Sequence, residues 1–166
     1  MKLCGMKLCV FVAVLSVSMV HAAHSQSLDI GGIELRLGQK VDEALRSLSS
    51  YQVQYSNGSW IVTQKVGNLY QALGVIGATA NVISFISKSF NMDENEGTPE
   101  TYTRASKELR RRGGTNCTTR EVEYTDGLIH EFETQCGPYK LNYYMPSKTA
   151  DGMPILGGVF ISIRRQ

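Results

Sequence analysis

Residues 98–114 read TPETYTRASKELRRRGG, which is the clearest helix signal in the 166-residue chain. Thr98 supplies a capping hydroxyl, and Pro99 followed by Glu100 is typical of a first helical turn. The basic run Arg110–Arg112 suits the negative end of the helix dipole, and the two glycines after it end the helix. The apolar side of this helix is formed by Tyr102, Ala105 and Leu109.

The chain after this helix alternates between apolar and polar residues, which predicts strands. The expected strands are Cys117–Tyr124, Leu128–Cys136, Tyr139–Met145 and Leu156–Arg164. A two-residue turn at Asp126-Gly127 would place Cys117 opposite Cys136 and close the open end of a hairpin with a disulfide. This register puts Glu121 and Glu123 on the more apolar side. A three-residue turn avoids that but misaligns the cysteines, and a β-bulge would reconcile the two.

The first half of the chain has a similar order, a short helix followed by strands. A strand-like alternation over Ile30–Leu37 leads into residues 37–48, where Val41, Leu45 and Leu48 recur at helical spacing. Apolar residues at that spacing predict a short amphipathic helix.

Two hairpins are expected after this first helix. Asn57-Gly58 lies between the alternating runs Tyr51–Tyr55 and Trp60–Val66, and this is the strongest short hairpin signal a sequence carries. Residues 72–90 fit either a helix or two strands that turn near Ala80-Asn81. Their glycines and β-branched residues favour the two strands.

These segments predict an α+β fold in which antiparallel sheets are each covered by a short helix. We expect two tandem helix-plus-sheet modules, residues 28–92 and 99–166, with the disulfide hairpin in the second. The acidic residues 93–98 are interpreted as the linker between them.

Residues 1–22 are interpreted as a signal peptide. Lys2 and Lys7 form a positive beginning, and Leu8–Val20 is an apolar stretch of the length usual for a signal core. The same stretch is short for a bilayer span, which argues against the alternative of an uncleaved anchor. We therefore expect an exported protein, periplasmic or extracellular, whose only membrane contact is through this segment before cleavage.

The start of the mature chain has more than one candidate. Cleavage fits after Ala22 or as late as Ser25, because small residues occupy the required positions in both cases. Met6 repeats the opening MKLC sequence and is a second candidate for the initiating residue.

The charge of the mature chain argues against nucleic acid as a partner. Removing Lys2 and Lys7 with the signal leaves 15 of the 17 Lys and Arg residues against 15 Asp and Glu. Nucleic-acid binders keep a basic excess on the working domain, because neutralising phosphates supplies most of their affinity.

Cys117 and Cys136 are the two cysteines that remain after the signal is removed. In an oxidising compartment such a pair forms a disulfide by default. Zinc would need four ligands, and few histidines remain to supply them. We expect no metal and no cofactor.

An enzyme is the rival class. His130 stands beside Glu131 and Glu133 and is a conceivable general base for a small envelope hydrolase. No nucleophile motif accompanies it, and a partly buried structural histidine with solvated glutamates explains the same residues. We therefore expect a non-enzymatic protein.

Aromatic residues on the expected strands are the candidate binding face. Strands alternate, so part of this set must point away from a one-sided core, and exposed aromatics on a sheet are typical of a protein-binding surface. Aromatic cover of a thin core is the alternative. The residues are Trp60, Tyr51, Tyr55, Tyr139, Tyr143 and Tyr144.

The stretch Leu37–Leu45, LGQKVDEAL, is similar to the strand–glycine–short-helix entry of the β-lactamase-inhibitor-protein fold and of the related outer-membrane-assembly lipoproteins of the SmpA/OmlA type. The order of hairpins and helices also resembles that fold over most of the mature chain. The chain departs from it in lacking a lipobox cysteine and a cysteine pair in its first half. The resemblance implies a protein-binding module of a bacterial envelope or secretome, with an envelope assembly factor as the alternative.

Overall fold

The computed structural model describes residues 26–90, 97–123, 130–145, 147–148, 151–152, 154–155 and 157–165. The expected signal peptide, the acidic residues 93–96 and the Asp126-Gly127 turn lie outside the described residues.

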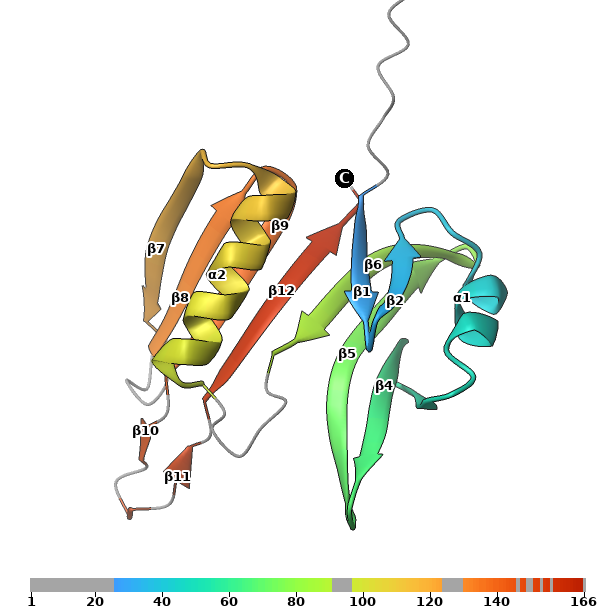
Figure 1. Ribbon diagram of the computed structural model, residues 1–166, viewed down its shortest axis with the longest axis horizontal. Helices are drawn as coiled ribbons and strands as arrows, with labels where there is room; N and C mark the ends of the chain where they lie inside the picture. The colour runs from blue at the N-terminus through green and yellow to red at the C-terminus, as the bar shows by residue number, and fades with distance from the viewer. Residues whose placement is uncertain are drawn as a thin grey trace, which may run out of the picture.

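Eight antiparallel strands form one continuous sheet in the order β3-β4-β5-β6-β12-β9-β8-β7 (Figure 1). The strands are β3 (Gln52–Ser56), β4 (Ser59–Val66), β5 (Leu69–Thr79), β6 (Val82–Ser89), β7 (Cys117–Glu123), β8 (His130–Cys136), β9 (Tyr139–Tyr144) and β12 (Gly158–Arg164). The two halves of the chain meet at the pair β6–β12 in the middle of the sheet. The protein is an α+β protein, whereas its division into two tandem modules stays a prediction.

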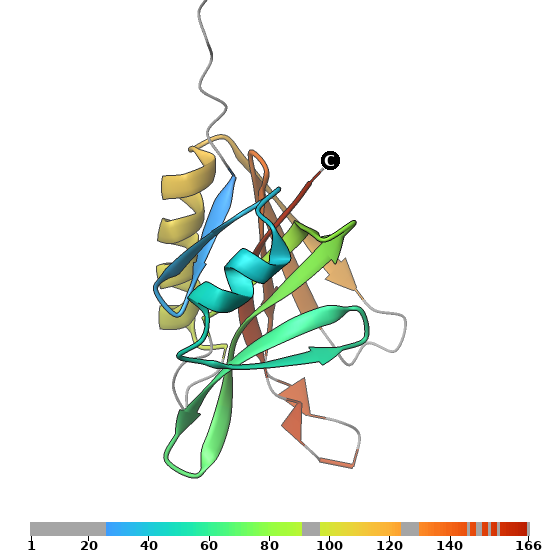
Figure 2. The same ribbon diagram turned by 90° about the vertical axis from the view of Figure 1, so that its right-hand side faces the viewer.

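Two helices and a small hairpin cover one face of this sheet. They are α1 (Val41–Ser47), α2 (Pro99–Gly113) and the hairpin of β1 (Ser27–Ile30) and β2 (Ile33–Arg36). In Figure 1 α2 and the β1–β2 hairpin stand in front of the sheet, and Figure 2 shows α1 on the same side. A separate short pair joins β10 (Ser147–Lys148) to β11 (Pro154–Ile155).

The hydrophobic core lies between the sheet and this cover. The hairpin contributes Leu28, Ile30 and Leu35, and α2 contributes Ala105 and Leu109, all of them buried. The sheet contributes Val62, Leu73, Ile76, Ile83, Ile86, Leu141, Val159, Ile161 and Ile163. A single cluster therefore spans both halves of the chain.

The β1–β2 hairpin corrects the expectation of one strand over Ile30–Leu37. Gly31 and Gly32 both have positive φ, of 60° and 83°, and reverse the chain between two short strands. Glycine reaches that conformation without steric cost, so the pair forms a two-residue hairpin turn.

A partly buried group of charges links this hairpin to the rest of the cover. The Arg112 guanidinium, whose side chain is 10% exposed, lies 2.9 Å from Asp29 and donates to the Ser27 carbonyl at 3.0 Å. Lys88 of β6 forms a salt bridge of 2.7 Å with the same aspartate, and Glu108 of α2 forms one of 2.5 Å with Arg112. Arg112 therefore links α2 to β1 in addition to its expected place at the negative end of the helix.

Local turn and capping signals were reliable elsewhere. Asn57-Gly58 turns β3 into β4 with positive φ at both residues, and Ala80-Asn81 does the same between β5 and β6. The two-strand interpretation of residues 72–90 is thus confirmed. At the start of α2 the Thr98 hydroxyl accepts the Thr101 N–H at 3.3 Å, as the sequence predicts.

The disulfide between Cys117 and Cys136 is present and the two residues are register partners. The register continues without a shift to Glu123 and His130, which is the pairing predicted for a two-residue turn, and no β-bulge interrupts it over the described residues. Glu121 does lie opposite Phe132. The edge strand β7 tolerates this because α2 packs over β9, β12 and β8, which leaves Glu121 exposed.

Removing the disulfide should lower stability substantially. Replacing both cysteines with alanine is expected to reduce the free energy of unfolding by about 3 kcal/mol, because the bridge closes a loop of roughly 20 residues in the unfolded chain. Urea denaturation measures the change, and wild-type protein under reducing conditions should shift by a similar amount. A double variant that unfolds at the wild-type urea concentration would contradict this.

Gly74 of β5 is expected to be intolerant of any side chain. A Cβ there would lie 2.3 Å from the Ser87 carbonyl oxygen and 2.8 Å from Ile30 Cδ1, because the β1–β2 hairpin packs directly on the strand. Gly74→Ala should cost about 1–3 kcal/mol of stability. Gly77→Ala is the matched control, since its Cβ would come no closer than 3.2 Å to another atom. Equal losses in the two variants would exclude this packing argument.

Candidate functional site

The face of the sheet opposite the helices is open. Along β12 the residues Val159, Ile161 and Ile163 are buried under the cover, while Phe160, Ser162 and Arg164 alternate with them and point to the other side. The open side is hollowed, and its main hollow has a volume of about 670 Å³. Its lining residues, which we call the open face, are Phe85, Ser87, Gln135, Pro138, Lys140, Asn142, Tyr144, Phe160, Ser162, Arg164 and Arg165.

Two smaller hollows extend the open face to either side. One, of about 430 Å³, shares Phe85, Arg164 and Arg165 with it and reaches the turn between β3 and β4. The other, of about 360 Å³, shares Gln135 and Lys140 and reaches the edge strand β7. The depression therefore runs across the junction of the two halves of the sheet.

Aromatic rings stand on both sides of that junction. The rings of Tyr144 and Phe160 meet edge to face, with centroids 6.0 Å apart. Across the β6–β12 pair, the Arg164 guanidinium carbon lies 5.2 Å from the ring centroid of its register partner Phe85. The space beside Phe85 stays free because residue 77 on β5 is a glycine. A Cβ at this position would lie 3.2 Å from the Phe85 Cβ.

A ladder of charges crosses β7, β8 and β9 on the same face. The Glu133 carboxylate accepts hydrogen bonds from Lys140 at 2.7 Å and from Arg120 at 2.7 Å. Asn142 donates to Glu133 at 3.4 Å and to the buried Glu131. The hydrogen bond from Lys140, helped by that from Arg120, outweighs the opposing effect of burial and lowers the pKa of Glu133.

The remaining charge on the open face is positive. Glu133 is neutralised by two cations. Arg164 and Arg165 are exposed, and no carboxylate of the described residues pairs with either. The face thus combines aromatic rings with arginine side chains that are available to a partner.

The six aromatic residues chosen from the sequence do not form one surface. Tyr144 alone belongs to the open face. Tyr139 is buried, and Tyr143 lies under α2, where its ring centroid is 4.9 Å from that of Tyr102 and its hydroxyl donates to the Gly97 carbonyl at 2.9 Å. Burial, with the neighbouring Tyr102, raises the pKa of Tyr143.

The other three lie in the first half, on the covered side. Tyr51 donates its hydroxyl to the Gly31 carbonyl and so supports the turn of the β1–β2 hairpin. Trp60 packs against the core. The Tyr55 ring lies tilted against Trp60 with a centroid distance of 4.9 Å and remains 61% exposed. None of the three belongs to the open face.

Phe85, Phe160 and Arg164 are not among the binding residues predicted from the sequence. The signal that could have found them is their position between buried residues of the same strands, such as Ile161 and Ile163. They lie on the open side because side chains alternate between the two faces of a sheet, and these residues alternate with buried ones. Their residue type does not decide this.

The enzymatic candidate stays untested. His130 is the register partner of Glu123, and its side chain lies outside the described residues. Of its neighbours, Glu131 is buried against Asn142 and Glu133 is held ionised by two cations. Among the described residues, no group of three or more His, Cys, Asp or Glu could hold a metal ion.

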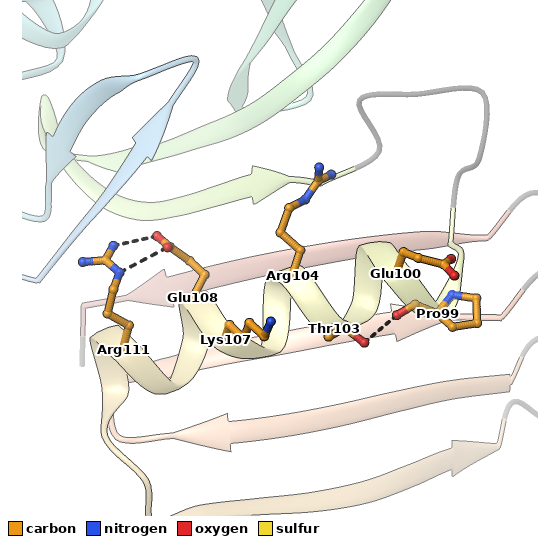
Figure 3. A pocket seen from close by; sticks show the side chains of 7 residues that line it. All are labelled: Pro99, Glu100, Thr103, Arg104, Lys107, Glu108 and Arg111. Carbon is orange, nitrogen blue, oxygen red and sulfur yellow. Dashed lines mark hydrogen bonds and ion pairs between the residues drawn. The ribbon is translucent and has the colours of Figure 1, made fainter.

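Another hollow, of about 490 Å³, lies along α2 (Figure 3). Its charged side chains are mostly engaged: Arg111 pairs with Glu108 at 3.0 Å, and Arg104 donates to the Phe90 carbonyl at 3.1 Å. All of its lining residues belong to one helix. It gathers no residues from different parts of the chain, unlike the open face.

Comparisons with protein-family models, with curated proteins and with solved structures find no significant match to this chain. In the described part of the chain, neither helix has the length and apolar character needed to cross a membrane.

The charge ladder predicts an acid-sensitive contribution to stability. Because the pKa of Glu133 is lower in the folded protein, its contribution is present above the usual glutamate pKa of about 4.3 and is lost as the pH falls through the folded value. Glu133→Gln should therefore be less stable than the wild type at neutral pH, and the difference should shrink below about pH 4. Urea denaturation of both proteins over a pH series tests this, and a difference that does not change with pH would contradict it.

Proposed function

We propose that the protein is an exported, non-enzymatic binding module that docks a partner protein on the open face of its sheet. The observation that carries the proposal is the hollowed surface, which has no described element over it and presents Phe85, Tyr144, Phe160 and Arg164. Aromatic and arginine side chains dominate the energetics of protein interfaces. A depression of this kind suits a protruding segment of a partner.

The charge on the open face indicates which partners fit. Arg164 and Arg165 favour a partner with carboxylates facing them, because opposite charges steer association and suppress wrong partners. Nucleic acid is a poorer fit, since the mature chain carries equal numbers of basic and acidic residues.

Export is part of the proposal. The Cys117–Cys136 disulfide fits a compartment outside the reducing cytoplasm. The signal-like residues 1–22 support export to the periplasm or beyond. The resemblance of Leu37–Leu45 to the β-lactamase-inhibitor-protein fold supports a role in binding and names no partner.

The tandem organisation is proposed on the order of the strands. Each half supplies one helix and four strands of the sheet, with its first strand, β3 or β7, at an edge and its last, β6 or β12, at the centre. Two related modules joined about a two-fold axis would produce this order. An assembly factor within an envelope complex would use the same open face and differs only in having several partners.

Site-specific cross-linking tests the docking surface. A photo-reactive amino acid in place of Ser162, at the centre of the open face, should give a discrete adduct when the protein is irradiated in its own cells. The same replacement at Lys107, on the exposed side of α2, should not. Arg164→Glu should reduce the adduct at Ser162, while Arg111→Glu, a matched reversal on α2, should leave it unchanged.

Two outcomes would count against the proposal. Equal adducts from Ser162 and Lys107 would show that the open face is not preferred, and no adduct from either would leave the face without a partner. His130→Ala separates the enzymatic alternative, because a binding module should fold and keep the Ser162 adduct in this variant. Loss of the adduct with an intact fold would assign His130 a role that the proposal does not contain.

A further inference from the structure

The hairpin of β4 and β5 extends beyond the sheet that it belongs to. Strand β3 pairs with β4 only as far as Thr63, and β6 pairs with β5 only from Gly74 onward. From Gln64 to Gln71 the two strands pair with each other and with no third strand of the described residues. Figures 1 and 2 show the end of this ribbon projecting away from the body of the protein.

The end of the ribbon is apolar. Leu69 is 76% exposed, Tyr70 59% and Val66 54%, and these are three of the five large hydrophobic residues exposed in the described chain. Val66 and Leu69 are register partners on one side, while Tyr70 is paired with Lys65 on the other. Gly67, with φ of 59°, keeps the turn between them tight. We call Val66–Tyr70 the hairpin tip.

The stretch of sequence that contains the hairpin tip has no acidic residue. The sequence has no Asp or Glu from residue 44 to residue 92, and the basic residues in that stretch are Arg46, Lys65 and Lys88. Lys88 is paired with Asp29 of β1, whereas Lys65 is exposed beside the tip. A negatively charged surface would therefore attract the ribbon end-on.

We propose that the hairpin tip inserts into the headgroup region of a membrane that carries anionic lipids. Apolar side chains on both sides of the ribbon suit a surface that surrounds the tip, and tyrosine and lysine are residues that lie at the level of the headgroups. The ribbon has unpaired backbone edges, so it stays at the interface and does not enter the hydrocarbon. This adds a membrane contact to the one expected through the signal segment.

One small anchor gives weak, reversible attachment. The tip lies at the Leu69 end of β5, whereas the hollows of the open face reach this strand at Gly77–Thr79, its other end. Membrane contact and partner docking are therefore separate properties, and each can fail without the other.

Flotation of the purified mature protein with lipid vesicles tests the proposal. Vesicles of phosphatidylcholine and phosphatidylglycerol in equal parts should bind the wild type, and those of phosphatidylcholine alone should bind it less. Leu69→Gln should weaken binding about tenfold, since it removes the most exposed of the three apolar side chains at the tip. Met145→Gln is the matched control, because Met145 is another exposed apolar residue, 41% exposed, that follows β9 and lies outside the hairpin tip.

A second readout reports insertion directly. Leu69→Trp should give a blue shift of tryptophan emission on adding the mixed vesicles, beyond that of the wild type with its single tryptophan, Trp60. Lys65→Gln should reduce the preference for phosphatidylglycerol without altering the fold. Because the tip lies outside the core, each variant should keep the wild-type urea midpoint. If Leu69→Gln lowers that midpoint, Lys65→Gln still tests the proposal.

Three results would overturn the proposal. They are absence of wild-type flotation with both vesicle types, equal loss in Leu69→Gln and Met145→Gln, and no emission shift in Leu69→Trp. If Leu69→Gln instead abolishes the cross-link from Ser162 while the wild type does not float, the tip contacts the protein partner and not lipid.

Discussion

The pairing of β6 with β12 is the interaction on which the architecture depends. It joins the last strand of the first half to the last strand of the chain, in a register that sets Ile86 beside Ile163. Without it there would be two smaller sheets with edges exposed at the centre. With it the core becomes one cluster, and Phe85 and Arg164 become neighbours on the open face.

A second constraint decides which face remains open. The β1–β2 hairpin lies on the sheet beside α2, held there by Arg112, Asp29 and Lys88. Partly buried charges are costly unless they are paired, and here each has a partner of opposite sign. Burial alone would raise the pKa of Glu108, but hydrogen bonds from Arg112 and Arg111 outweigh it and lower that pKa. The cover is thereby fixed to one side, and the proposed docking surface is left on the other.

The elements of the fold were largely predictable because their signals are local. Capping by Thr98, the Asn57-Gly58 turn and the spacing of the cysteines act within a few residues or one hairpin, and all three hold in the structure. The Gly31-Gly32 turn carried the same kind of signal and was missed because the strand before it is only four residues long. The β-bulge that would reconcile the two registers of the β7–β8 hairpin is unnecessary, because an edge strand without a helix above it can expose a carboxylate such as Glu121.

The sequence by itself determined the α+β class, the positions of both helices, most of the hairpins and the disulfide pair. It also determined the balanced charge of the chain that follows the signal-like segment. Only the tertiary structure decided which side of each strand is covered. Alternation defines two sides but does not say where a helix will lie, so Tyr139 and Tyr143 were as plausible on a binding face as Tyr144. Nor could the sequence show that Arg164 and Phe85 are neighbours. They are separated by 78 residues, and only the central pairing of β6 with β12 brings them together.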